Sequence, residues 1–114
     1  RVDMVYACAD MSPDLIDIMV KAGAKGIVIA GVGDGNMTTA TLEAAKKAAA
    51  QGIWVVRASR IPIGKVLIKG EVNDKEYGTI CSDELNPQKA RVLLMLAMLK
   101  KRSWDDMQRL FIEY

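Results

Sequence analysis

The sequence contains 114 residues, of which 51 % are hydrophobic and 26 % are charged, a composition typical of a globular chain with a hydrophobic core. Its net charge of +2 gives no argument for nucleic acid or an anionic membrane as a partner. The longest apolar run, residues 92–99, is far shorter than the roughly 20 residues of a membrane-spanning helix. Histidine is absent, which excludes Ser-His-Asp and Cys-His catalysis within this sequence and most zinc sites. We expect no metal and no cofactor.

Strand and helix patterns alternate along the chain. Apolar segments predict strands over residues 2–8, 26–30, 53–58 and 79–81. Helical spacing and capping residues predict helices over residues 13–22, 38–51, 87–99 and 103–114, and residues 61–72 are expected to form a long loop. This order predicts a single domain over residues 1–114 with an α/β fold. We expect a three-layer sandwich around a short, about four-stranded, mostly parallel sheet of the flavodoxin or Rossmann kind.

Two further expectations concern burial. The helix over residues 87–99 is apolar nearly all round after Arg91, so we expect it to be buried. Cys8 and Cys81 stand in apolar, strand-like surroundings, and we expect both to be buried free thiols.

The segment Gly31-Val32-Gly33-Asp34-Gly35-Asn36 lies between a predicted strand and a predicted helix. Three glycines in five residues indicate a sharp turn or the close approach of a ligand, and ligands of open α/β sheets bind beyond the carboxyl ends of the strands. Asp34 and Asn36 are therefore candidate binding residues. A dinucleotide site is the less favoured interpretation, because Asn36 replaces the third glycine of that motif and Asp34 would repel a pyrophosphate. A tight turn that needs glycine only for its geometry is the other alternative.

A second candidate is the charged segment around Glu71, which continues through Asn73 and Asp74 to Glu76. A charged loop is usually solvated surface, and the pattern alone favours that interpretation. A carboxylate there could instead hold an ammonium group of a ligand. Arg57 and Arg60 flank the end of a predicted strand and could pair with acidic groups across an interface.

Three motifs in order carry a resemblance to a known family. They are Ala30-Gly31-Val32-Gly33-Asp34-Gly35-Asn36, Val55-Val56-Arg57-Ala58-Ser59-Arg60-Ile61-Pro62 and Leu85-Asn86-Pro87-Gln88-Lys89-Ala90-Arg91-Val92-Leu93-Leu94. Together they resemble the C-terminal domain of bacterial L-asparaginases, nearer to the type II enzymes that also hydrolyse glutamine to varying degrees. The resemblance implies a two-domain parent that converts L-asparagine and water to L-aspartate and ammonia.

In that family the nucleophile is a threonine of the N-terminal domain, in motifs that this sequence lacks. The resemblance therefore implies that this chain is the C-terminal domain without its catalytic partner, and that it is inactive alone. It also implies a homotetramer of intimate dimers, whose active sites are shared between subunits. By motif position, Asn36 matches the asparagine that closes the neighbouring site, and Glu71 matches the glutamate that helps hold the substrate's α-ammonium group.

Other consequences of the resemblance remain open. A periplasmic or secreted parent is implied by the type II enzymes, with the cytoplasm as the alternative. Asp34 stands where the family more often has an uncharged residue, so an extra carboxylate could alter the preference between asparagine and glutamine. The alternative function is a non-catalytic α/β domain for self-association or small-ligand binding.

Overall fold

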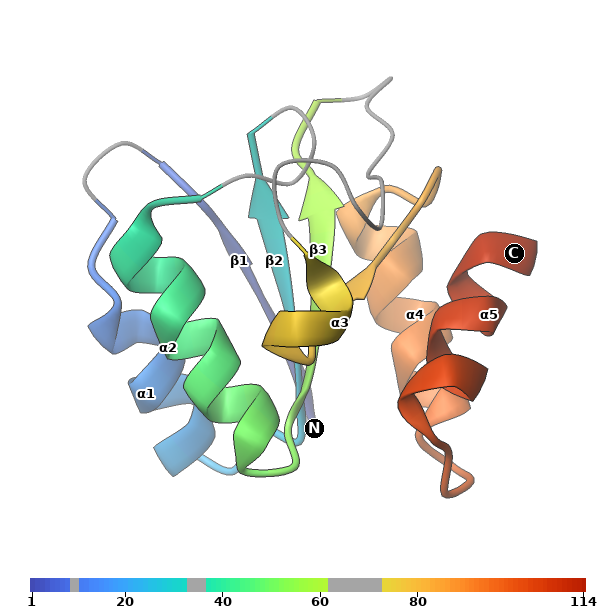
Figure 1. The fold of residues 1–114 in the computed structure, drawn as a ribbon. Helices are drawn as coiled ribbons and strands as arrows, with labels where there is room; N and C mark the ends of the chain where they lie inside the picture. The colour runs from blue at the N-terminus through green and yellow to red at the C-terminus, as the bar shows by residue number, and fades with distance from the viewer. Residues whose placement is uncertain (9–10, 33–36, 62–72) are drawn as a thin grey trace.

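The computed structural model describes residues 1–8, 11–32, 37–61 and 73–114, which form a parallel sheet between two layers of helices (Figure 1). The strands are β1 (Val2–Tyr6), β2 (Gly26–Gly31), β3 (Trp54–Ser59) and β4 (Ile80–Cys81). The helices are α1 (Asp14–Lys21), α2 (Thr39–Ala50), α3 (Asp74–Tyr77), α4 (Pro87–Ala97) and α5 (Trp104–Glu113). The three-layer α/β fold predicted from the sequence is confirmed.

The four strands are all parallel and lie in the sequential order β1-β2-β3-β4. β2 is buried along its whole length, as its uninterrupted apolar sequence requires. Because β2 and β3 alternate their side chains between two faces, Val28 and Val56 enter one core while Ile27 and Val55 enter the other.

The two cores separate the helices into layers. α1 and α2 cover one face of the sheet, and α4 and α5 cover the other (Figure 1). Gly26 at the start of β2 permits the close approach of α4, because a Cβ atom added there would lie 2.9 Å from Cδ2 of Leu94 and 3.0 Å from Sδ of Met98. α4 therefore packs directly against the amino end of the central strand.

Capping side chains begin three of the helices where the sequence predicts. Thr38, Asn86 and Ser103 each accept a hydrogen bond from the backbone N–H three residues later. α1 begins without such a cap bond: Pro13 occupies the cap position, and the Ser12 hydroxyl accepts a hydrogen bond from the N–H of Asp14 at 3.3 Å. Side-chain capping thus accounts for the starts of α2, α4 and α5.

Two burial predictions are wrong. α4 buries only the side facing the sheet, and Val92, Met95 and Leu96 are exposed on its outer side. The apolar run that suggested full burial therefore creates an apolar surface instead. Cys8 is also exposed, because β1 ends at Tyr6 rather than continuing through residue 8, whereas Cys81 is buried; both are free cysteines. No helix in the described part of the chain is long and apolar enough to cross a membrane.

The outer edge of β4 is covered by α5. The side-chain amide of Gln108 accepts a hydrogen bond from the N–H of Cys81 at 2.8 Å and donates one to its carbonyl at 3.0 Å. These are the two main-chain groups that a neighbouring strand would otherwise pair, so α5 closes this edge of the sheet.

Candidate functional site

The two residues predicted to bind substrate, Asn36 and Glu71, lie outside the described residues, as does Asp34. Both residues lie close in the sequence to a helix cap. In the sequence, Asn36 comes two positions before Thr38, which is the N-cap of α2. Glu71 comes two positions before Asn73, which is the N-cap of α3. The roles of Asn36 and Glu71 therefore remain predictions.

Arg60 joins the ends of three strands. Its N–H donates to the carbonyl of Gly31 at the end of β2 (2.8 Å), and its guanidinium Nη1 donates to the carbonyl of Ala7 beyond β1 (3.1 Å). Ser59, the last residue of β3, accepts a hydrogen bond on its hydroxyl from the N–H of Ile61 at 3.1 Å. The contacts described for Arg60 are therefore with main chain at the carboxyl edge of the sheet.

Arg57, on β3, forms a buried ion pair within the chain, rather than the pairing across an interface that the sequence suggested. Its Nε lies 2.6 Å from Oδ1 of Asp74 and its Nη2 lies 2.7 Å from Oδ2, and both side chains are 0 % exposed. The hydroxyl of Thr79 donates to the same Oδ1 at 2.6 Å. We call Arg57, Asp74 and Thr79 the buried network.

The sequence interpretation missed this network. The sequence pattern favoured a charged, solvated loop from Glu71 to Glu76, yet Asp74–Tyr77 form α3, and Asp74 is fully buried while Asn73 and Glu76 are exposed. A local signal for the helix was present, because Asn73 is a good N-cap and Gly78 adopts the left-handed conformation that ends the helix. No local pattern indicates that Asp74 pairs with Arg57, because the two residues are 17 positions apart in the sequence.

Cys81 lies next to this network, since it is paired in register with Arg57. Burial, together with the nearby charge of Asp74, raises the pKa of its thiol from 9.0 to about 11. A thiol with so high a pKa is a poor nucleophile near neutral pH. Among the described residues no cluster of His, Cys, Asp and Glu is arranged to hold a metal ion.

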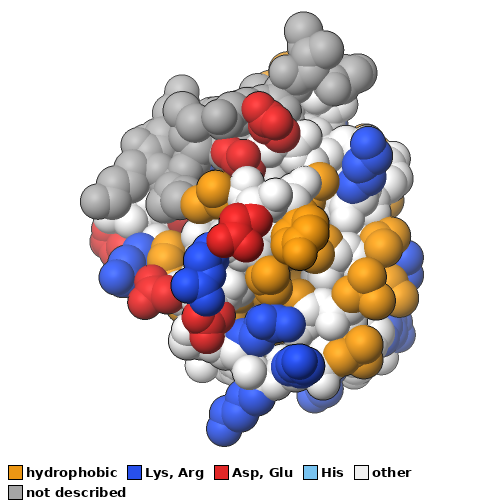
Figure 2. Space-filling model, turned by 90° about the vertical axis from the view of Figure 1, so that its right-hand side faces the viewer, with side chains coloured by type: hydrophobic (Ala, Val, Ile, Leu, Met, Phe, Trp, Pro, Cys, Tyr) orange, Lys and Arg blue, Asp and Glu red, His pale blue; other side chains and the backbone are white. Residues whose placement is uncertain are grey.

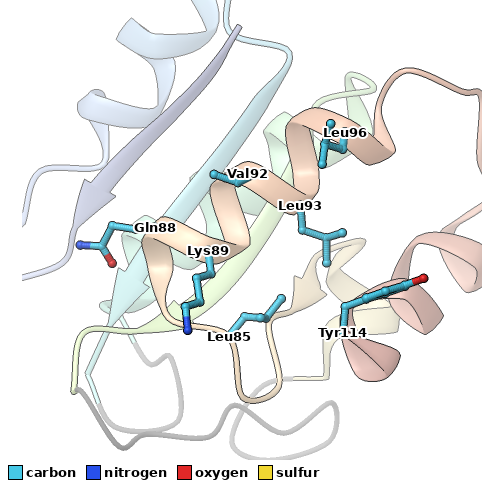
Figure 3. A pocket seen from close by; sticks show the side chains of 7 residues that line it. All are labelled: Leu85, Gln88, Lys89, Val92, Leu93, Leu96 and Tyr114. Atoms are coloured by element: carbon cyan, nitrogen blue, oxygen red, sulfur yellow. The ribbon is translucent and has the colours of Figure 1, made fainter.

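An apolar groove of about 430 Å³ lies between α4 and the end of α5. Figure 3 shows Val92, Leu93 and Leu96 projecting from α4, with Tyr114 across the groove from them. Its other lining residues are Leu85, Gln88 and Lys89. Figure 2 shows several hydrophobic side chains near one another on one side of the molecule, with both basic and acidic side chains around them. A surface of this kind is typical of a protein interface.

Comparison with known proteins gives one consistent result. Residues 1–111 match the model of the glutaminase/asparaginase C-terminal domain. The chain is 40 % identical over 114 residues to the probable periplasmic L-asparaginase of Haemophilus influenzae and 42 % identical to L-asparaginase 2 of Escherichia coli. It is also 40 % identical to the glutaminase-asparaginase of Acinetobacter glutaminasificans.

These alignments cover 99–100 % of this chain but 33–34 % of the relatives. The chain thus spans about a third of the length of the curated relatives it matches. The resemblance seen in the three sequence motifs is confirmed, and it extends over almost every residue of the fold described above. The chain belongs to the glutaminase/asparaginase C-terminal domain family.

Proposed function

We propose that this chain is the C-terminal domain of an L-asparaginase that hydrolyses the side-chain amide of L-asparagine to give L-aspartate and ammonia, with some activity on glutamine. The observation that carries the proposal is the identity of 40–42 % to proteins named as L-asparaginases along the whole chain. Bond cleavage is assigned to an N-terminal domain that supplies the threonine nucleophile. The chain of 114 residues is then inactive when isolated.

In this proposal Glu71 and Asn36 position the substrate. The Glu71 carboxylate provides a fixed countercharge for the α-ammonium group, and charge-assisted hydrogen bonds of this kind are stronger and shorter than neutral ones. The Asn36 amide both donates and accepts, so it can orient a ligand and a carboxylate at once. Neither residue breaks a bond, and both contribute by holding the reacting amide in place.

The strand order supports a site shared with another domain or subunit. A ligand crevice in an open α/β sheet forms where the strand order reverses, and the order β1-β2-β3-β4 of the described strands contains no reversal. The apolar groove between α4 and α5 also supports association with another domain or subunit, because its lining residues Val92, Leu96 and Tyr114 are exposed to solvent. We propose that the parent protein is a homo-oligomer, and that it is periplasmic like the relative from H. influenzae.

The test measures hydrolysis of L-asparagine by the full-length protein through the ammonia that is released. The wild type is compared with the variant Glu71→Gln. We expect KM to rise about tenfold while kcat changes little, because the lost interaction is made in the ground state and the transition state alike. Glu76→Gln is the matched control, since it removes the same charge from an exposed position on α3. No hydrolysis by the wild type, or equal effects of the two variants, would contradict the proposal.

A further inference from the structure

We infer that the outer side of α4 binds the same side of α4 in a second copy of this chain, with the two helices antiparallel and Val92 next to the two-fold axis. The inference rests on the homo-oligomer of the proposed function, but not on the proposed reaction. It names the contact surface, the direction of the two helices and their register.

The outer side of α4 has the residue spacing of a helix that packs against another helix. The residues at heptad spacing, in alternating steps of three and four positions, are Leu85, Gln88, Val92, Met95 and Leu99. We call these five residues the α4 stripe. Val92 and Leu99 are 54 % and 80 % exposed, whereas Ala90 and Leu94 on the inner side of the helix belong to the core. The stripe therefore has the pattern of a helix seam but no second helix against it in this chain.

A groove lies on each side of the α4 stripe. The first is the apolar groove between α4 and α5, into which Leu93 projects opposite Tyr114 (Figure 3). The second has a volume of about 290 Å³ and lies between the end of α4 and the start of β1. Its lining residues are Arg1, Val2, Lys25, Met95, Met98 and Leu99. Helices pack by placing a ridge of one helix into a groove of the other, so a ridge between two grooves fits a second helix of the same kind.

The charges at the two ends of α4 determine the direction of the second helix. Glu84 is exposed just before α4, and Lys100 and Lys101 are exposed just after it. Glu84 and Lys100 are each eight positions from Val92, so an antiparallel pair centred on Val92 brings Glu84 of each copy level with Lys100 of the other. A parallel pair would instead place like charges side by side at both ends, which is unfavourable.

The same register makes the surface complementary to itself, which favours a second copy over a different protein. In a contact about a two-fold axis, each residue that meets a second residue is met by it in return. Leu85 and Leu99 are each seven positions from Val92, so these two apolar ends of the stripe lie level. Lys89 and Met95 are each three positions from Val92, so Lys89 lies level with an apolar side chain and not with another basic one.

The first test is disulfide formation in the full-length protein with Val92→Cys. A residue next to the two-fold axis meets its own copy, and a disulfide requires Cα atoms within about 7 Å of each other. We therefore expect mild oxidation to give a covalent dimer at least about tenfold faster than in the controls, as measured by non-reducing electrophoresis.

Two controls accompany this variant. The wild type contains the exposed Cys8 and measures background oxidation. Leu96→Cys is the matched control for register, because Leu96 is also exposed on α4. It lies four positions from Val92, so two introduced thiols there would be about 12 Å apart along the helix axis.

The second test exchanges the charges at the ends of α4. Glu84→Lys and Lys100→Glu, each combined with Val92→Cys, place like charges at both ends of their own dimers. Each is expected to form the disulfide roughly threefold to tenfold more slowly than Val92→Cys alone. Co-expression of the two variants restores unlike charges at both ends of the mixed dimer, and the rate is expected to recover. Glu43→Lys, at an exposed position of α2 on the opposite face of the sheet, is expected to leave the rate unchanged.

The outcomes separate this inference from the proposed function. If Val92→Cys forms the disulfide no faster than Leu96→Cys while sedimentation velocity shows an oligomer, the inference is overturned and the proposed homo-oligomer stands. An introduced thiol at position 92 that neither pairs nor reacts with iodoacetamide also overturns the inference, because another part of the protein then covers α4. A monomeric full-length protein overturns the inference and the homo-oligomer together, whereas the proposed reaction is tested separately by Glu71→Gln.

Discussion

Arg57 and Asp74 lie 17 positions apart in the sequence and form an ion pair in which both side chains are completely buried. Asp74→Asn removes the carboxylate charge that offsets the buried guanidinium, and we expect it to lower the free energy of unfolding by roughly 3 kcal/mol. Urea denaturation followed by circular dichroism measures this change.

The matched control for that prediction is Asp106→Asn. Asp106 pairs with Arg109 at 3.0 Å, but the two side chains are 50 % and 67 % exposed, so its loss is expected to cost less than about 1 kcal/mol. Equal costs at the two aspartates would show that the buried pair has no special role in stability.

Gln108→Met tests how the edge of β4 is closed. The substitution keeps a side chain of similar size but leaves the buried N–H and carbonyl of Cys81 without the two hydrogen bonds from α5. We expect a loss of about 2 kcal/mol or more, because unsatisfied buried polar groups are costly. Gln88→Met serves as the control, since the Gln88 amide donates to Tyr6 Oη at an exposed position, and a change within about 0.5 kcal/mol is expected there.

The two cysteines are expected to differ in reactivity. Cys8 is exposed, whereas Cys81 is buried and its thiol pKa is raised to about 11. Treatment of the folded chain with iodoacetamide near pH 8, followed by peptide mass mapping, should therefore modify Cys8 well before Cys81. Both should react at comparable rates in urea. Equal rates in the folded chain would contradict the burial of Cys81.

The raised pKa of the Cys81 thiol predicts that the free energy of unfolding depends on pH. The folded pKa of about 11 lies above the ordinary thiol value of 9.0, so the native state binds this proton more tightly than the unfolded state. The contribution is fully present below pH 9 and is lost as the pH rises towards 11. Between pH 9 and 11 we expect the free energy of unfolding of the wild type to fall relative to that of Cys81→Ala. Urea unfolding midpoints of both proteins at several pH values measure this difference.

Leu96→Glu tests the apolar surface of α4. Leu96 is 60 % exposed and lines the groove between α4 and α5, so a charge there should weaken any association that covers the groove. We expect sedimentation velocity to show less self-association than in the wild type. Leu15→Glu is the control, because Leu15 is an exposed residue of α1, which covers the opposite face of the sheet. Identical behaviour of the two variants would argue against α4 as an interface.

Most of the fold could be predicted because its signals are local. The caps at Thr38, Asn86 and Ser103 and the fully apolar β2 are all readable within a few residues. The alternation of strands and helices along the sequence also predicts a parallel sheet that is covered by helices.

The remaining features depend on contacts between distant segments. The pairing of Arg57 with Asp74, and of Gln108 with Cys81, cannot be inferred from spacing, since each joins elements that are adjacent only in the folded chain. The exposed side of α4 was misjudged for a related reason. An apolar helix indicates burial, but the sequence does not say whether this chain or another molecule covers it. The binding roles of Asn36 and Glu71 stay predictions.

The closure of β4 by Gln108 has a consequence for biosynthesis. Gln108 follows Cys81 by 27 positions, so at about 5–20 residues per second the ribosome needs roughly one to five seconds to produce it after β4. Met107 and Phe111, which complete one of the two cores, arrive in the same interval. Until α5 has been made and has folded onto β4, the outer edge of this strand lacks Gln108 and is open to chaperones and to edge-to-edge association.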